Sequence, residues 1–197
     1  DLDMPLVIKV ASIPKERIKV YFIDNEDYFK RKATFNDEAG KLFKDNDERA
    51  IFFAKGVIET IKRLNWPPDV IHVHGWFSSF FPLYLKEMYK DEPIFQNSKI
   101  ITSIYGTGFA GSLNKKLQDK ILFDEVEKNK IMHIKTPSYV NLMKTAIDFS
   151  DALIVGSENI SKELQDYLDK CKKPVLEFQS KDSFIEKYTE FYNKLLN

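Results

Sequence analysis

The sequence is poor in the residues that build several common kinds of site. It has one cysteine, Cys171, in 197 residues, which excludes an intrachain disulfide and a metal cage made of cysteines. Its 30 basic residues balance 30 acidic ones, so no net charge attracts nucleic acid or anionic lipid. No apolar run approaches the roughly 18 residues of a transmembrane helix. We therefore expect no nucleic-acid partner, no membrane partner and a cytoplasmic location.

The short motifs of several enzyme classes are also absent. Gly106, Gly108 and Gly111 lie close together but do not have the GxGxxG spacing of a dinucleotide site. No GxSxG element occurs, and no histidine lies near Cys171 in the sequence, so hydrolase chemistry has no support. We expect no cofactor.

Apolar and aromatic residues, by contrast, are plentiful. The sequence is 43% hydrophobic and contains 16 phenylalanines and 9 tyrosines, which is typical of a folded domain with a sizeable core. Two strand-like runs, 6–13 and 18–23, are separated by a short polar turn and predict a hairpin. The polar and aromatic segment 25–40 is expected to lie over the domain surface in short helices or loops.

Two capping boxes predict where long helices begin. Asp45 with Glu48 precedes a helix that should end near Trp66, because two prolines follow. Ser183 with Glu186 precedes the last helix, whose apolar stripe is Phe184, Tyr188, Phe191, Tyr192 and Leu195.

From residue 69 onward, strands and helices alternate. Such alternation predicts a three-layer, Rossmann-like α/β fold with a mostly parallel sheet, and we expect residues 1–197 to form one such domain. The expected strands cover 69–73, 99–105, 151–156 and 174–178, and the expected helices cover 77–90, 138–149, 159–170 and 183–196, with helical segments between 114 and 131.

Three of the expected strands end in small or polar residues, at 74–76, 105–108 and 156–158. The carboxyl ends of parallel strands are where open α/β sheets bind ligands. Glycine allows close approach to the backbone, and the start of a following helix offers free N–H groups to anions, as expected at Gly156 and Ser157. The alternative is that each segment is an ordinary tight turn.

His72, His74 and Trp76 crowd around the first of these strand ends. His72 and His74 share one face of a strand, but no third metal ligand is evident, so we expect no metal. His72, inside the buried run, is expected to be a hydrogen-bonded core histidine, whereas His74 is open to a ligand contact or a structural role. Trp76 could stack on a sugar ring or serve as a packing anchor.

Several segments, in this order, resemble bacterial glycogen synthases and plant starch synthases. The resemblance extends from about Val7 to Glu163. It is carried by residues 23–29 (Ile-Asp-Asn-Glu-Asp-Tyr-Phe), by Asp45 and Asn46 with Arg49 and the Phe52-Phe53 pair, by residues 66–74 (Trp-Pro-Pro-Asp-Val-Ile-His-Val-His) with Pro-Leu-Tyr-Leu-Lys at 82–86, and by residues 143–151 leading to Gly156-Ser157.

The resemblance implies a retaining glucosyltransferase of the GT-B fold. Such an enzyme transfers glucose from ADP-glucose to the non-reducing end of an α-1,4-glucan, and this chain would supply its N-terminal Rossmann-like half. The implied partners are α-glucan and ADP-glucose. The expected contacts with glucan or glucose are Asp45, Asn46, His74, Trp76, Tyr105, Asn141 and Lys144.

The sequence departs from this family in three ways. The family's glycine-rich lysine loop has no counterpart in these residues. The last histidine of its His-x-His-Asp-Trp-His motif is replaced by Phe77, and its Thr-Ile-His-Asn motif appears as Ser103-Ile-Tyr105-Gly106. Only about 40 residues follow Ser157, so we expect these 197 residues to lack the second, nucleotide-binding domain with its diphosphate-binding residues.

These departures bear on what the chain does alone. The chain resembles a fragment of a longer enzyme, and we expect it to transfer glucose very poorly by itself unless a homo-oligomer or a partner chain supplies the missing half. The alternative is a non-catalytic glucan-binding or regulatory module derived from the same family.

Overall fold

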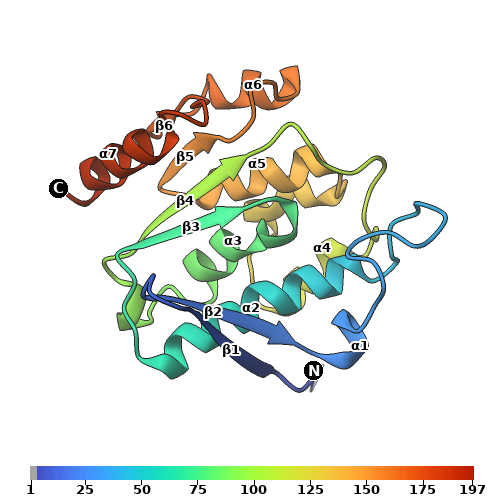
Figure 1. Cartoon of the computed structure of the whole chain (residues 1–197). Helices are drawn as coiled ribbons and strands as arrows, with labels where there is room; N and C mark the ends of the chain where they lie inside the picture. Colours follow the sequence, from blue (N-terminus) through green and yellow to red (C-terminus); the bar gives the residue numbers. More distant parts are fainter. Residues whose placement is uncertain (1–3) are drawn as a thin grey trace.

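The computed structural model describes residues 4–197 and contains a parallel sheet flanked by helices on both faces (Figure 1). The sheet has the order β3 (Val70–His74), β4 (Lys99–Ile104), β5 (Ala152–Val155) and β6 (Val175–Leu176). All three neighbouring pairs are parallel. These strands are short apolar runs, as is usual where both faces of a sheet are covered, and the predicted α/β class is confirmed.

Most helices pack on one face of the sheet. They are α2 (Asn46–Leu64), α3 (Phe80–Glu87), α5 (Tyr139–Phe149) and α6 (Lys162–Leu168). Their apolar side chains form one core with Val73, Ile100 and Leu153 of the strands. Because side chains alternate along a strand, this core takes one set of strand residues and leaves the other set for the opposite face.

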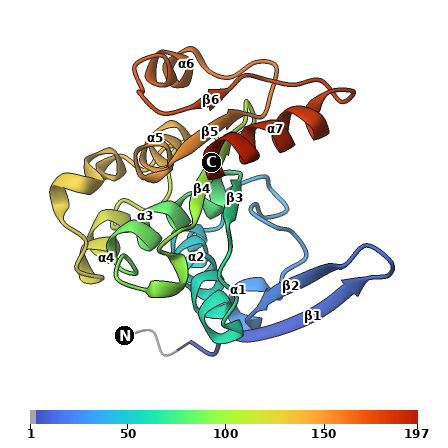
Figure 2. The same cartoon turned by 90° about the vertical axis from the view of Figure 1, so that its left-hand side faces the viewer.

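A single helix, α7 (Phe184–Leu196), covers the opposite face (Figure 2). Phe191 is its one buried residue and packs against Ile101, Ala152 and Ile154. Tyr188, Tyr192 and Leu195 are half-buried against the same cluster, as the predicted stripe requires. Phe184, the first residue of that stripe, is 40% exposed and is the exception.

The N-terminal residues form the predicted hairpin. Strands β1 (Val7–Ile13) and β2 (Ile18–Asp24) pair in antiparallel fashion as a separate two-stranded sheet, and Ile23 of β2 lies close to Gly56 of α2. The tip of the hairpin extends away from the parallel sheet (Figure 2). The following segment begins with α1 (Glu26–Phe29). It does not only lie over the surface as expected, because Tyr28 is buried.

Both predicted capping boxes are wrong, although the helices begin where expected. Neither Asp45 nor Ser183 makes a side-chain cap hydrogen bond. An N-cap residue normally has an extended backbone, whereas ψ is 12° at Asp45 and −16° at Ser183. The end of α2 is as predicted, because Asn65 adopts a left-handed conformation just before Trp66.

The other connections are short helical segments. A 3₁₀ turn, Trp76–Ser78, precedes α3, so the predicted helix over 77–90 is divided. A second 3₁₀ turn, Pro93–Phe95, leads into β4. Helix α4 (Leu117–Phe123) and a kinked 3₁₀ segment, Lys128–Lys135, occupy the region where helical segments were predicted.

Candidate functional site

The ends of β3, β4 and β5 meet at one edge of the sheet, as the sequence predicts. The Nδ1 atom of His74 lies 2.7 Å from the hydroxyl of Tyr105. The backbone N–H of Gly106 donates to the Oγ atom of Ser157 at 3.0 Å. His74 is exposed and Tyr105 is half-buried. The structure therefore brings His74, Tyr105, Gly156 and Ser157 together.

The glycines at this edge allow neighbouring protein groups to come close. A Cβ atom on Gly156 would lie 2.6 Å from the ring of Tyr105, and one on Gly106 would lie 2.1 Å from the carbonyl oxygen of Asn159. Both distances are shorter than real Cβ contacts. Substitution would therefore displace Tyr105 or the loop after β5, so close packing explains both glycines.

The expected helix start at Gly156 and Ser157 is wrong. Helix α6 begins at Lys162, and Ser161 caps it by accepting from the N–H of Leu164. Ser157 instead accepts from the N–H of Gly106. The free N–H groups of a helix start are therefore not at Gly156 and Ser157, and anion binding there stays a prediction without that support.

His72 is the hydrogen-bonded histidine that the sequence predicts. Its Nδ1 atom lies 2.6 Å from the hydroxyl of Tyr192, and its Nε2 atom lies 2.7 Å from the Oγ atom of Ser103. Burial, followed by the nearby His74 ring, lowers the pKa of His72 to about 3. Partial burial also lowers the pKa of His74. Both imidazoles are therefore neutral at pH 7.

The two histidines do not gather further metal-binding side chains. No group of three or more His, Cys, Asp or Glu residues within 4–197 is arranged to hold a metal ion. The imidazole nitrogens of His72 are already engaged by hydroxyl groups. The expected absence of a metal stays a prediction that metal analysis of purified protein can test.

Trp76 lies on the other side of this sheet edge, inside an aromatic cluster. Trp76 is only 7% exposed. The ring centroid is 4.8 Å from that of Phe35 and 4.9 Å from that of Phe109. Phe77, at the position where the resembled family has a histidine, joins the cluster at 5.2 Å from Phe35. Burial favours the packing role for Trp76 over stacking on a sugar.

Asp45 and Asn46 brace the segment that carries Phe35. The carboxylate of Asp45 accepts hydrogen bonds from Arg31. Burial alone would raise the pKa of Asp45, but the hydrogen bond and charge of Arg31 outweigh it and hold this pKa below its usual value. Asn46 is fully buried, donates to the carbonyl of Phe35 at 2.8 Å and accepts from Arg49 at 2.5 Å. Both ends of the Asn46 amide are thus used within the protein.

Asn141 and Lys144 lie on α5, and their side chains contact residues outside that helix. The side-chain N–H of Asn141 donates to the carbonyl of Thr136 at 2.7 Å. The ammonium of Lys144 lies 2.6 Å from the carboxylate of Glu163 and 5.3 Å from the ring centre of Tyr167, both on α6. Lys144 is therefore neutralised at the contact between α5 and α6, and its role in sugar binding stays a prediction.

The sequence did not predict the role of two tyrosines that contact residues of β3 and of the loop after β4. The hydroxyl of Tyr139 donates to the carbonyl oxygen of Tyr105, and its ring lies so close to Gly108 that a Cβ atom there would be 2.3 Å away. Tyr192 reaches His72 from α7. Each tyrosine is more than 30 residues away in the sequence from the residue it contacts. An aromatic residue in a predicted helix was the only feature of the sequence that pointed to either one.

A cleft opens beside the aromatic cluster. It lies between segment 36–44 and the loop 108–114 that follows β4, and it has a volume of about 700 Å³. Its lining mixes amide, hydroxyl and ammonium groups with the rings of Phe43 and Phe109. Phe109 connects the cleft to Trp76. The polar lining residues are Asn36, Lys41, Lys44, Ser112 and Asn114.

Comparison with known proteins places this chain in a family. Residues 2–173 match the starch synthase catalytic domain family. The glycogen synthase of Chlorobium luteolum is 36% identical over 180 residues, covering 87% of this chain and 36% of that protein. The glycogen synthase of Chlorobium chlorochromatii is 37% identical over 161 residues, covering 81% and 32%. The chain thus spans about a third of the length of these relatives.

A solved structure has the same fold. The catalytic domain of starch synthase IV from Arabidopsis thaliana, bound to ADP and acarbose, aligns with a TM-score of 0.67 at 18% sequence identity. The alignment covers 90% of this chain and 38% of that one, so the chain has the fold of one GT-B half. None of the helices within residues 4–197 is both long and apolar enough to cross a membrane. From the family match and the identity to its relatives, the chain belongs to the starch synthase catalytic domain family, together with the bacterial glycogen synthases.

Proposed function

We propose that this chain supplies the α-glucan-binding half of a glycogen or starch synthase. The complete enzyme would transfer glucose from ADP-glucose to the non-reducing end of an α-1,4-glucan with retention. One observation carries the proposal: in a member of this family, exposed His74 and half-buried Tyr105 form a pair at the carboxyl edge of the parallel sheet. Ligands bind at that edge in open α/β sheets.

The chemistry of this edge suits a sugar. A neutral imidazole can donate or accept a hydrogen bond, and Nδ1 of His74 is already engaged by Tyr105. Nε2 is therefore the atom that we assign to a glucose hydroxyl. The cleft between 36–44 and 108–114 offers further polar groups to hydroxyls and the rings of Phe43 and Phe109 to sugar C–H faces.

A donor site requires free cations, and three of the cations in this domain are already paired with carboxylates. Departure of a nucleoside diphosphate is assisted by cations that neutralise its developing charge. Lys144 is paired with Glu163, Lys120 with Asp47 and Glu48, and Arg31 with Asp45. We therefore propose that residues 1–197 form one Rossmann-like domain and that a second domain or a partner chain supplies the diphosphate-binding residues. The starch synthase IV domain that shares this fold was solved with ADP, which is consistent with ADP-glucose as the donor.

Two assays on the same preparation test this proposal. Native mass spectrometry first establishes the oligomeric state of the chain. Calorimetry with maltoheptaose and radiolabelled glucose incorporation from ADP-glucose into glycogen then separate acceptor binding from transfer. We expect binding with transfer at the background level. Failure to bind maltoheptaose would refute the glucan-binding role, and robust transfer would show that a diphosphate site exists within this chain or its homo-oligomer.

A further inference from the structure

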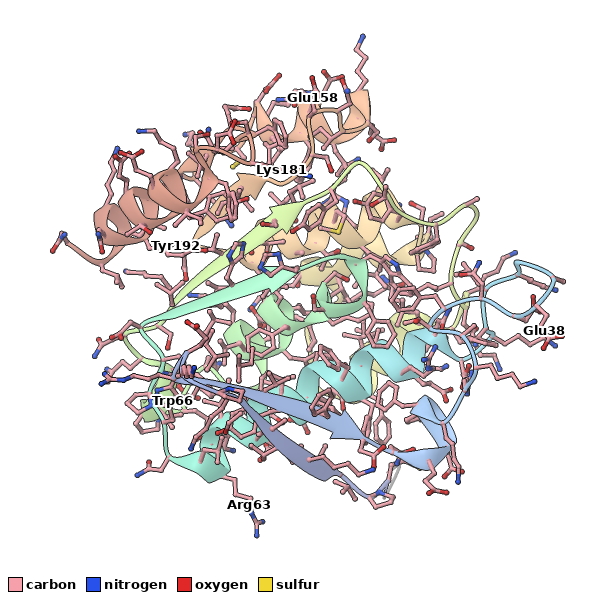
Figure 3. All side chains as sticks on the ribbon, viewed as in Figure 1. Glu38, Arg63, Trp66, Glu158, Lys181 and Tyr192 are labelled. Carbon is pink, nitrogen blue, oxygen red and sulfur yellow. The ribbon has the colours of Figure 1, made fainter. Side chains whose placement is uncertain are left out.

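Helix α7 contacts His72 through the hydroxyl of Tyr192 and through the ring of Tyr188, whose centroid is 5.9 Å from that of His72. His72 and His74 are two residues apart on β3, so both project from the face of the sheet that α7 covers. Tyr192 extends from α7 toward the sheet (Figure 3). Its hydroxyl lies 2.6 Å from Nδ1 of His72, while Ser103 of β4 lies 2.7 Å from Nε2. The His72 ring is thus fixed at both nitrogens.

The fixed ring of His72 is also a surface for His74. The two ring centroids are 3.9 Å apart, with 36° between the ring planes. The His74 ring has a second contact, the hydrogen bond between its Nδ1 atom and the hydroxyl of Tyr105. His72 and Tyr105 together therefore determine which way Nε2 of His74 points.

We infer that Tyr192 is a positioning residue for His74 and acts through His72. This inference rests on the proposed function, in which Nε2 of His74 binds a glucose hydroxyl. If the Tyr192 hydroxyl is removed, Nδ1 of His72 loses its partner and the ring can turn. The surface against which His74 packs then changes, although neither Tyr192 nor His72 is required to touch the sugar.

The structure allows the hydroxyl to be tested without removing α7. Phe191, Tyr188 and Leu195 hold α7 on the sheet independently of this hydrogen bond. The Tyr192→Phe substitution keeps the aromatic ring and removes only the hydroxyl. Ser103→Ala removes the partner at the opposite nitrogen of His72 and provides a second variant in a different element.

Tyr167→Phe is the matched control. The hydroxyl of Tyr167 lies 3.0 Å from Nε2 of His133 and donates to Asp148 at 2.7 Å. This substitution also removes a tyrosine hydroxyl beside a histidine, but it does so at the contact between α6 and α5. The chain has 3 histidines, so each imidazole can be assigned in a spectrum by its own His→Gln variant.

The experiment compares imidazole NMR signals and sugar affinity. In Tyr192→Phe and in Ser103→Ala, the ring ¹⁵N and ¹³C shifts of His72 and His74 should both change while those of His133 stay constant. In Tyr167→Phe, only His133 should respond. The dissociation constant for maltoheptaose should rise about threefold to tenfold in Tyr192→Phe, as expected if the hydrogen bond from His74 to the sugar is weakened or lost. It should stay unchanged in Tyr167→Phe.

The two readouts separate this inference from the proposed function. If wild-type protein does not bind maltoheptaose, the proposed function fails, and the NMR signals alone still decide whether Tyr192 controls His74. If the His72 signals change in both variants but the His74 signals do not, the inference is wrong. It is also wrong if the His74 signals change but wild type binds maltoheptaose with the same affinity as Tyr192→Phe.

Discussion

His74 and Trp76 are two residues apart but occupy contrasting surroundings. On the α7 side of the sheet edge, His74 is exposed and contacts Tyr105 through a hydrogen bond. On the α2 side, Trp76 is 7% exposed and contacts Phe35 and Phe109 through its ring. Gly75, between them, turns the chain from one side to the other with φ of 73°. A strand end can therefore place a polar residue at the surface and an apolar residue in the core within one turn.

Trp76→Ala should have the largest effect on stability. Removing a buried aromatic side chain costs about 3–5 kcal/mol of unfolding free energy, because transfer from water is lost and a cavity remains. Urea denaturation followed by circular dichroism measures this change. His74→Ala is the control and should cost far less, since His74 is exposed. Equal losses in the two variants would contradict the contrast between the two sides.

Gly75→Ala should disturb both sides through the backbone. Gly75 has φ of 73° and ψ of 168°, a region that is nearly restricted to glycine and costs roughly 1–3 kcal/mol for other residues. A Cβ atom here would meet no atom within 4 Å, so the cost comes from the backbone alone. Denaturation of Gly75→Ala tests this, and unchanged stability would show that the turn relaxes.

The paired histidines should make stability depend on pH. Because burial lowers the pKa of folded His72 to about 3, below the roughly 6.5 of an unfolded histidine, the unfolded chain binds a proton first as pH falls. The contribution of neutral His72 is complete above about pH 6.5 and is lost toward pH 3, at up to about 1.4 kcal/mol per pH unit.

The His72→Gln variant isolates this contribution from that of the carboxylates. The difference in unfolding free energy between wild type and His72→Gln should shift in favour of the variant as the pH falls from 7 to 4. A difference that is constant over this range would contradict a depressed pKa at His72.

The sequence predicted much of the fold, and the reasons lie in local patterns. The apolar runs of β3, β4 and β5 and the stripe of α2 are set by periodicity, which reports burial directly. The parallel order of the strands follows from their alternation with helices. The capping boxes failed because a cap depends on backbone angles and on competing partners, and Arg31, fourteen residues away, binds Asp45 instead.

The candidate site was predicted only in part, because side-chain partners come from distant segments. His74 and Tyr105 meet because β3 and β4 are adjacent and parallel, which the sequence indicates. The burial of Trp76 depends on Phe35, brought in by Asn46, and the pairing of Lys144 depends on α6. Neither contact produces a periodic pattern in the sequence from which it could be predicted.

Lys144→Ala should have the smallest effect on stability. Its partner Glu163 has a side chain that is 62% exposed, and ion pairs with an exposed partner contribute less than about 1 kcal/mol. Thermal denaturation of Lys144→Ala, with Glu163→Ala as its matched control, checks this expectation. A loss several times larger in Lys144→Ala alone would indicate that the contact with Tyr167 carries the stability.

We propose that the His74 side of the sheet edge binds α-glucan. Titration calorimetry of maltoheptaose into wild type and into folded His74→Ala tests it most directly. We predict that wild type binds and that His74→Ala binds about tenfold more weakly, because a sugar hydroxyl loses its hydrogen-bond partner. Equal affinities for wild type and His74→Ala would contradict the claim.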